Sequence, residues 1–127
     1  MTTFGATLTI DLRALAQNYQ TLNNQLSSGN LAAVVKANAY GLGVEESALA
    51  LDKAGCENFF VATLEEGIEL RKILPTTSVH IFHGVLPGTA KDIVAHNLVP
   101  ILNSLNQIEE WQPTAEHLAG LHIDTGM

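Results

Sequence analysis

Five short apolar runs recur along the chain, and each is rich in β-branched residues or phenylalanine. They cover residues 31–35, 59–62, 79–82, 98–102 and 121–123. None of them alternates strictly between apolar and polar positions, a pattern typical of strands that are buried on both faces in a parallel sheet. The midpoints of successive runs lie 20 to 27 residues apart. This spacing leaves room for one helix between each pair of strands.

The segments around these runs have the residues that begin helices. Asp11 precedes one such segment, Thr63 and Glu66 have the spacing of a capping box, and Ser104 and Gln107 repeat that spacing. We therefore expect helices over residues 12–26, 44–53, 64–74, 87–97 and 104–111. The apolar stripe of the first helix is expected to pack against the core.

Alternating helices and buried strands indicate an α/β protein, either a doubly wound sheet or a (β/α)8 TIM-type barrel. The units share no recurring side-chain pattern, which argues against a solenoid. The chain has 127 residues, whereas eight strand–helix units need roughly 250. On the barrel interpretation, residues 1–127 are the N-terminal portion of one domain with about its first five strands, and Met127 is not the natural end.

Composition excludes several classes of protein. Apolar residues make up 46% of the chain and charged residues 15%, which argues against intrinsic disorder. The formal net charge of −7 disfavours nucleic acids and anionic membranes as partners, because both are negatively charged. No apolar run approaches the roughly 18 residues of a membrane-spanning helix. The chain begins without the basic region of a signal peptide, and its single cysteine, Cys56, suits a small buried residue. We therefore expect a cytoplasmic protein.

The most informative residue for chemistry is Lys36, which ends the first apolar run. In a barrel, active-site residues follow the carboxyl ends of the strands. Beside an apolar wall an ammonium group loses part of its solvation, which favours the free amine that forms a Schiff base with a carbonyl. The alternative is a lysine that extends its charge into solvent from the strand end. Gly41 and Gly43 suit either a phosphate-binding loop or a simple turn, and a dinucleotide fingerprint fails at Glu46.

Other polar residues carry weaker predictions. His80 and His83 lie three apart in a strand, on opposite faces, so we expect no metal site. The carboxylates of the fourth segment, Glu65, Glu66 and Glu69, are expected to form a solvated helix face.

The sequence around Lys36, Val-Val-Lys-Ala-Asn-Ala-Tyr-Gly-Leu-Gly over residues 34–43, resembles the pyridoxal-phosphate lysine motif of alanine racemases. Three further segments are similar to that family in the same order. They are residues 9–19, residues 60–67, and the His-Ile-Asp-Thr-Gly-Met ending over residues 122–127. The resemblance therefore covers essentially the whole chain.

The resemblance implies roles for individual residues. Lys36 would bind pyridoxal 5'-phosphate as a Schiff base, and would then act as the base on the D-alanine face of the substrate Cα. Tyr40 would donate its hydroxyl to the cofactor phosphate, and Phe82 would line the cofactor pocket. Asp124 to Met127 would form one wall of the substrate site, with Met127 as the substrate-binding residue.

The resemblance also implies a cytoplasmic, homodimeric alanine racemase that supplies D-alanine for peptidoglycan in the cell wall. The family's second base is a tyrosine from the C-terminal β-domain of the partner subunit, and an arginine contacts the pyridine nitrogen. This chain contains neither, and the β-domain is absent, so these 127 residues alone are expected to be inactive. Two alternatives remain on related barrels: a non-catalytic pyridoxal-phosphate carrier and an amino-acid decarboxylase.

Two positions depart from the family pattern. Leu42 stands where the family often has histidine, so a polar contact is lost there. His122 stands where the family commonly has a lysine that is carbamylated to orient an arginine. Imidazole cannot form that carbamate, so if the arginine is oriented at all, another acceptor or an anion must do so.

Overall fold

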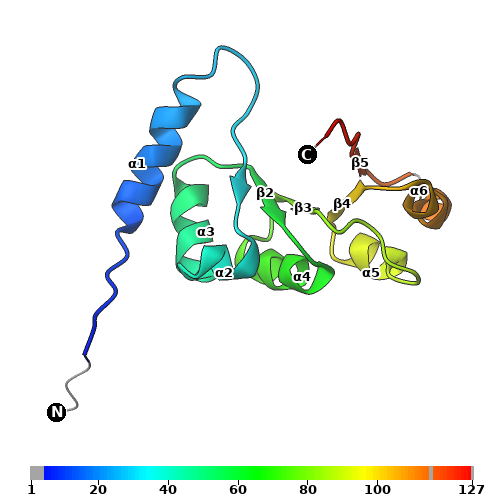
Figure 1. Ribbon diagram of the computed structural model, residues 1–127, viewed down its shortest axis with the longest axis horizontal. Coiled ribbons are helices and arrows are strands. Elements are labelled where there is room, and N and C mark those ends of the chain that lie inside the picture. The colour runs from blue at the N-terminus through cyan, green and yellow to red at the C-terminus, as the bar shows by residue number, and fades with distance from the viewer. Residues whose placement is uncertain (1–4, 115, 127) are drawn as a thin grey trace.

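A computed structural model describes residues 5–114 and 116–126 and contains a five-stranded parallel sheet. The strands follow one another in sequence order: β1 (Ala33–Val34), β2 (Asn58–Val61), β3 (Ser78–Ile81), β4 (Val99–Leu102) and β5 (Gly120–Leu121). The order of a doubly wound sheet reverses at a switch point, and here it does not. Figure 1 shows helices along one side of an arc of strands, as in part of a barrel wall. The prediction of an α/β fold with five barrel strands is confirmed.

The two faces of the sheet differ in burial. Alternate residues such as Phe59, Val61 and Ile81 are fully buried against the helices. The residues between them, including Phe60 and His80, point to the other face and are only partly buried. The prediction of strands buried on both faces is therefore wrong for this chain, because the described helices cover one face alone.

Each predicted helix is present, with shorter bounds in four of the five cases. The helices are α1 (Leu12–Asn23), α3 (Val44–Lys53), α4 (Leu64–Ile73), α5 (Ala90–Ala95) and α6 (Leu105–Trp111). The fourth begins late because Leu86 and Thr89 form a turn, in which the Thr89 hydroxyl accepts from the Leu86 N–H at 3.1 Å. Two short elements were not predicted: α2 (Lys36–Tyr40) and the 3-10 turn η1 (Gln112–Thr114). In the described residues, no helix is long and apolar enough to cross a membrane.

Side chains cap these helices largely as expected. The Asp11 carboxylate accepts from the N–H groups of Arg13 and Ala14 at the start of α1. Thr63 and Glu66 form the predicted capping box of α4. The second box is only half formed, because the Ser104 hydroxyl caps α6 while the Gln107 amide bonds elsewhere.

Helix α1 lies beside α3, away from the sheet (Figure 1). Tyr19 is its buried residue, and the hydroxyl lies 3.2 Å from the Leu31 carbonyl and 3.3 Å from the Gly55 carbonyl. Leu22 and Leu26 are exposed. The prediction that the whole stripe packs in the core is wrong at this end, because Leu26 lies beyond the helix, which ends at Asn23, and Leu22 in its last turn is open to solvent.

Arg71 joins three chain segments at the amino ends of β3 and β4. Its guanidinium donates to four backbone carbonyls at 2.7–3.2 Å, those of Leu74, Thr77, His96 and Asn97. Burial lowers the pKa of Arg71 from its ordinary value, although an arginine still remains charged. The arginine therefore satisfies loop carbonyls that β-ladder bonds do not reach.

Candidate active site

Lys36 lies two residues beyond the end of β1, at the carboxyl edge of the sheet, as predicted. It opens onto a cavity of about 590 Å3 at the ends of the strands. The cavity is lined by Lys36, Ala62, Phe82, His83, Ile101, Asn103, Leu121 and His122. Apolar side chains make up much of this wall. One amine thus faces a largely apolar hollow.

Two aromatic rings flank the lysine. The Lys36 Nζ atom lies 5.9 Å from the centroid of the Tyr40 ring and 5.9 Å from that of Phe82. Phe82 stacks on Phe60 at 5.1 Å, and Phe60 stacks on His80 at 4.4 Å. Both distances from Nζ lie within the reach of a cation–π contact. The structure therefore brings together Lys36, Tyr40 and Phe82, the three residues for which the resemblance implies contact with a cofactor.

The backbone after Lys36 forms a left-handed turn. Ala37, Asn38, Ala39 and Tyr40 have φ between +51° and +55°, followed by Gly41 at +88°. For residues with a Cβ atom this conformation costs on the order of 1–2 kcal/mol each. This turn was not predicted, and the glycines at 41 and 43 were its only signal in the sequence. Strain of this kind concentrates at functional sites.

Side chains hold the turn from both ends. The Glu66 carboxylate accepts from the Ala37 N–H at 2.9 Å, and the Asn38 side-chain oxygen accepts from the Val44 N–H at 2.8 Å, at the start of α3. Glu66 also accepts from the Ala62 N–H at 2.7 Å. The prediction of a solvated helix face is wrong for Glu66, which is half-buried because it bridges two strand ends.

A polar network forms the opposite rim. The Asn103 amide nitrogen donates to the carbonyls of Phe82 and Ile101, both at 2.8 Å, which leaves its oxygen to accept. His122 Nδ1 lies 2.9 Å from that oxygen, so the network assigns the proton to Nδ1. In the neutral ring, Nε2 is then left as an acceptor. Asn103 was not predicted as a site residue; its signal in the sequence was an amide directly after a buried strand.

Gln107 supports Asn103 from α6. Its side-chain oxygen accepts from the Asn103 N–H at 2.9 Å, and its side-chain nitrogen donates to the His83 carbonyl at 2.8 Å. Gly84 lies in the same network, and a Cβ atom there would meet the Ile101 carbonyl oxygen at 2.5 Å and the Gln107 side chain. The absence of a side chain at Gly84 lets the two loops approach.

The remaining predicted residues are less central. His83 lines the cavity. His80 lies within β3, and burial lowers the pKa of His80. The Asp124 carboxylate accepts from the Gly126 N–H at 3.0 Å. Met127 lies outside the described residues. In residues 5–114 and 116–126, no group of three or more His, Cys, Asp or Glu side chains could hold a metal ion.

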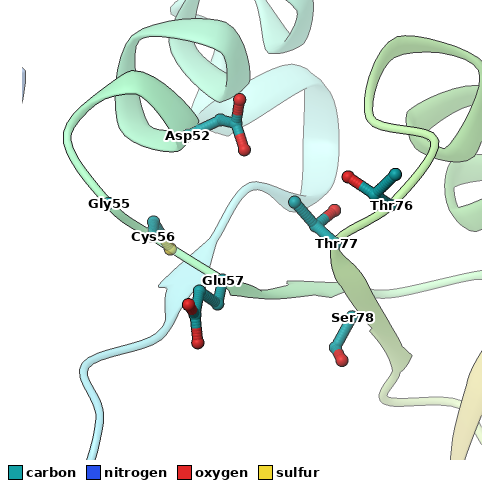
Figure 2. Close-up of a pocket in the computed structure, with 7 residues that line it drawn as sticks. All are labelled: Asp52, Gly55, Cys56, Glu57, Thr76, Thr77 and Ser78. Atoms are coloured by element: carbon teal, nitrogen blue, oxygen red, sulfur yellow. The ribbon is translucent and has the colours of Figure 1, made fainter.

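A second hollow lies at the opposite edge of the sheet, before β2 and β3 (Figure 2). Its volume is about 470 Å3, and Asp52, Gly55, Cys56, Glu57, Thr76, Thr77 and Ser78 line it. Burial raises the pKa of the Cys56 thiol, which lies 3.3 Å from the Asn58 carbonyl and acts as the predicted small buried residue. A neutral thiol is a poor nucleophile. Catalytic residues of barrels lie at the carboxyl edge, which favours the Lys36 cavity.

The donor set of the Lys36 cavity fits an aromatic aldehyde that carries a phosphate. An amine can bond covalently to the aldehyde, Phe82 and Ile101 offer apolar surface to a ring, and the Tyr40 hydroxyl can donate to a phosphate oxygen. Tyr40 is 64% exposed, so its hydroxyl is accessible from solvent. Pyridoxal phosphate has these three features.

Comparison with known proteins places this geometry in a family. Residues 10–127 match the model of the alanine racemase N-terminal domain. The alanine racemase of Rhizobium meliloti is 43% identical over 124 residues, which are 94% of this chain and 33% of the relative. The crystal structure of alanine racemase from Bartonella henselae with covalently bound pyridoxal phosphate has a TM-score of 0.80 at 40% identity, over 84% of this chain and 30% of that chain. The crystal structure of alanine racemase from E. faecalis has a TM-score of 0.82 at 34% identity, over 93% of this chain and 34% of that chain. The chain spans about one third of the length of the curated relatives it matches.

Proposed function

Because this chain belongs to the alanine racemase family, we propose that the full-length protein interconverts L-alanine and D-alanine with pyridoxal phosphate. The full-length protein is the longer polypeptide that is expected from the length of the relatives. Residues 1–127 are then the N-terminal portion of its barrel domain. The observation that carries the proposal is Lys36 Nζ at the carboxyl edge, 5.9 Å from each of two aromatic rings. A structural relative contains pyridoxal phosphate in covalent linkage.

Three residues of this chain would hold the cofactor. Lys36 provides the amine for the covalent bond, Phe82 provides an apolar face for the ring, and Tyr40 donates to the phosphate. The stack of Phe82 on Phe60 limits the freedom of that face. When bound, pyridoxal phosphate supplies an electron sink for negative charge at the substrate Cα. The protein contributes orientation and proton transfer.

The proton chemistry on one face of the substrate belongs to Lys36. Once the substrate amine has replaced Lys36 on the cofactor, the free Nζ atom would take the Cα proton from D-alanine. In the reverse direction it would deliver a proton to the same face. Racemisation needs a second group on the opposite face. The chain has two tyrosines; Tyr19 is the buried residue of α1, and Tyr40 lies on the lysine side. From its resemblance to the family, we assign the second base to a tyrosine outside this chain, contributed by the partner subunit of a homodimer.

The rim opposite Lys36 is proposed to contact the alanine substrate. His122 lines the cavity and, through Nε2, offers an acceptor for a positively charged donor such as an arginine. It would replace the anion that a carbamylated lysine provides in relatives. Met127, which follows Asp124 and Gly126 on the chain, is proposed to complete this wall. The protein would act in the cytoplasm and supply D-alanine for the cell wall.

Covalent labelling tests the proposal directly. We expect borohydride reduction of the cofactor-loaded full-length protein to leave one pyridoxyl group, located by peptide mass analysis at Lys36. Lys36→Met should abolish both the label and racemisation of either alanine enantiomer, at least about 10³-fold. Lys53→Met, an exposed lysine at the end of α3, serves as the matched control and should retain both.

The outcomes separate the functional classes. A label at Lys36 without racemisation would indicate a cofactor carrier, and release of carbon dioxide would indicate a decarboxylase. Labelling at another lysine, with Lys36→Met fully active, would overturn the assignment of the site.

A further inference from the structure

We infer that Glu66 is a positioning residue for Lys36: its carboxylate ties the left-handed turn after Lys36 to the end of β2. This inference rests on the proposed function of Lys36 and extends it to a residue of a neighbouring strand–helix unit. Glu66 contacts neither substrate nor cofactor on this account. It acts through the backbone that carries the lysine.

The contacts of Glu66 connect two strand ends. One carboxylate oxygen accepts from the Ala37 N–H at 2.9 Å, and the other accepts from the N–H groups of Ala62 and Thr63 at 2.7 and 3.4 Å. Ala37 follows Lys36, and Ala62 lines the same cavity as Lys36. A single half-buried side chain therefore links the backbone just beyond β1 to the backbone just beyond β2, where the cavity opens.

The turn needs such a contact because its backbone is strained. Four consecutive non-glycine residues, 37–40, have positive φ, and a conformation of this kind persists only when its surroundings impose it. The peptide N–H that Glu66 binds belongs to the first residue of that run. The bond thus restrains the peptide group between Lys36 and Ala37, and with it the direction in which the lysine side chain leaves the strand.

The contact acts through hydrogen bonds rather than by pairing charges. Of the side chains described here, Lys36 and Glu66 form no ion pair within 4.0 Å. A carboxylate offers acceptors on both oxygens, whereas a glutamine amide offers one acceptor and one donor. Glutamine can therefore satisfy β1 or β2 but not both, and aspartate is one methylene shorter.

The capping box provides a matched control within the same helix. The Thr63 hydroxyl accepts from the Glu66 N–H at 3.3 Å, so Thr63→Ala weakens the start of α4 without removing a carboxylate contact. If Glu66 only stabilised α4, the variants Thr63→Ala and Glu66→Gln would behave alike. If Glu66 positions Lys36, only the Glu66 variants alter the lysine.

The test begins with the full-length protein free of cofactor, using Glu66→Gln, Glu66→Asp and Thr63→Ala. We expect both Glu66 variants to speed hydrogen exchange at the Ala37 amide at least tenfold. They should also change the rate of Lys36 acylation by acetic anhydride at least threefold, relative to the exposed Lys53 in the same sample. Thr63→Ala should leave both quantities within twofold of the wild type.

The second measurement uses the cofactor. In Glu66→Gln, the rate of pyridoxal-phosphate attachment should fall at least tenfold and the pH dependence of the bound cofactor's absorbance should shift, while Thr63→Ala keeps the wild-type profile. Either folded Glu66 variant with wild-type exchange and acylation would overturn the inference, as would equal effects from Thr63→Ala. A wild-type Lys36 that never takes the cofactor would overturn the proposed function instead, while the cofactor-free measurements still decide the role of Glu66.

Discussion

At both edges of the sheet, side chains bind loop backbone that is not paired in the β-ladder, but the conformation of that backbone differs between the two edges. At the amino ends of β3 and β4, Arg71 donates to four loop carbonyls, so the backbone there is satisfied by one side chain. At the carboxyl ends, Lys36 is followed by four left-handed residues that Glu66 and Asn38 hold in place. Both edges use side chains to bind loop backbone. Only the carboxyl edge uses them to maintain a run of consecutive left-handed residues; at the amino edge, Asn97 is the single left-handed residue among the four that Arg71 binds.

This difference indicates that contacts at the amino ends of the strands serve stability, whereas contacts at the carboxyl ends serve the function of Lys36. A strained turn raises the free energy of the folded state, so a fold that keeps one needs compensating contacts elsewhere. In a barrel, the amino edge of the sheet can supply stability without obstructing the substrate. Substitutions at the two edges should therefore have separable effects, on unfolding at one edge and on Lys36 at the other.

The largest effect on stability is expected at Arg71. Arg71→Ala removes the donors from four carbonyls, and the loss of four hydrogen bonds at roughly 1 kcal/mol each should cost about 4 kcal/mol. We expect the free energy of unfolding of the full-length protein, measured in urea, to fall by that amount. Arg71→Lys should recover only part of the loss, because lysine has three donors on one atom.

If Arg71→Ala abolished cofactor attachment at Lys36 in samples that remain fully folded, the effects of substitutions at the two edges would not be separable. Attachment of pyridoxal phosphate at low urea, followed by peptide mass analysis, measures this directly. We expect a wild-type fraction of labelled Lys36 in the folded variant.

A smaller effect is expected at Gly84, which has φ of +68°. Gly84→Ala combines an unfavourable backbone conformation with a Cβ atom 2.5 Å from the Ile101 carbonyl oxygen. Together these should cost about 2–3 kcal/mol. Crowding should also displace Gln107, and with it Asn103 and His122, so the KM for alanine should rise in the same variant.

Gly88 offers a matched control for this experiment. It has φ of +80°, and a Cβ atom there would meet nothing within 4 Å. Gly88→Ala should therefore show the backbone cost alone, about 1 kcal/mol, with an unchanged KM. Equal unfolding free energies for the two variants would show that Gly84 does not depend on its close approach to Ile101.

The sequence predicted those parts of the molecule that local patterns determine. Apolar runs located five strands, and the Thr63–Glu66 spacing predicted a capping box that is present. The position of Lys36 at a strand end followed from the same pattern. These features depend on residues within a few positions of one another, so a single sequence contains the signal.

Long-range contacts explain what was missed. Glu66 was assigned to a solvated face because its partner Ala37 lies 29 positions away, and no local pattern marks that contact. The role of Asn103 depends likewise on the carbonyl of Phe82, 21 positions away. The left-handed turn after Lys36 contradicts the local preference of alanine, and only the surrounding contacts make it possible.

The smallest effect is expected between the two edges, at His80. Burial lowers the pKa of this imidazole below its ordinary value of 6.5. As the pH falls below 6.5, the unfolded chain therefore takes up a proton before the folded protein does. The His80 contribution to stability is complete above that pH and decreases as the pH falls towards the folded-state pKa. The slope cannot exceed about 1.4 kcal/mol per pH unit for one proton.

His80→Phe isolates this contribution because phenylalanine can keep the stack on Phe60. Urea unfolding of the full-length protein at intervals between pH 7.5 and pH 5 should show a shallower loss of stability in the variant than in the wild type. Parallel profiles would mean that His80 is as easily protonated in the folded protein as in the unfolded chain, and that burial does not penalise its charge. We expect the difference in unfolding free energy between variant and wild type to be confined to this pH range, with cofactor attachment at Lys36 unchanged. His80, within its strand, would then contribute to stability, as Arg71 does at the amino edge, and not to the chemistry of Lys36.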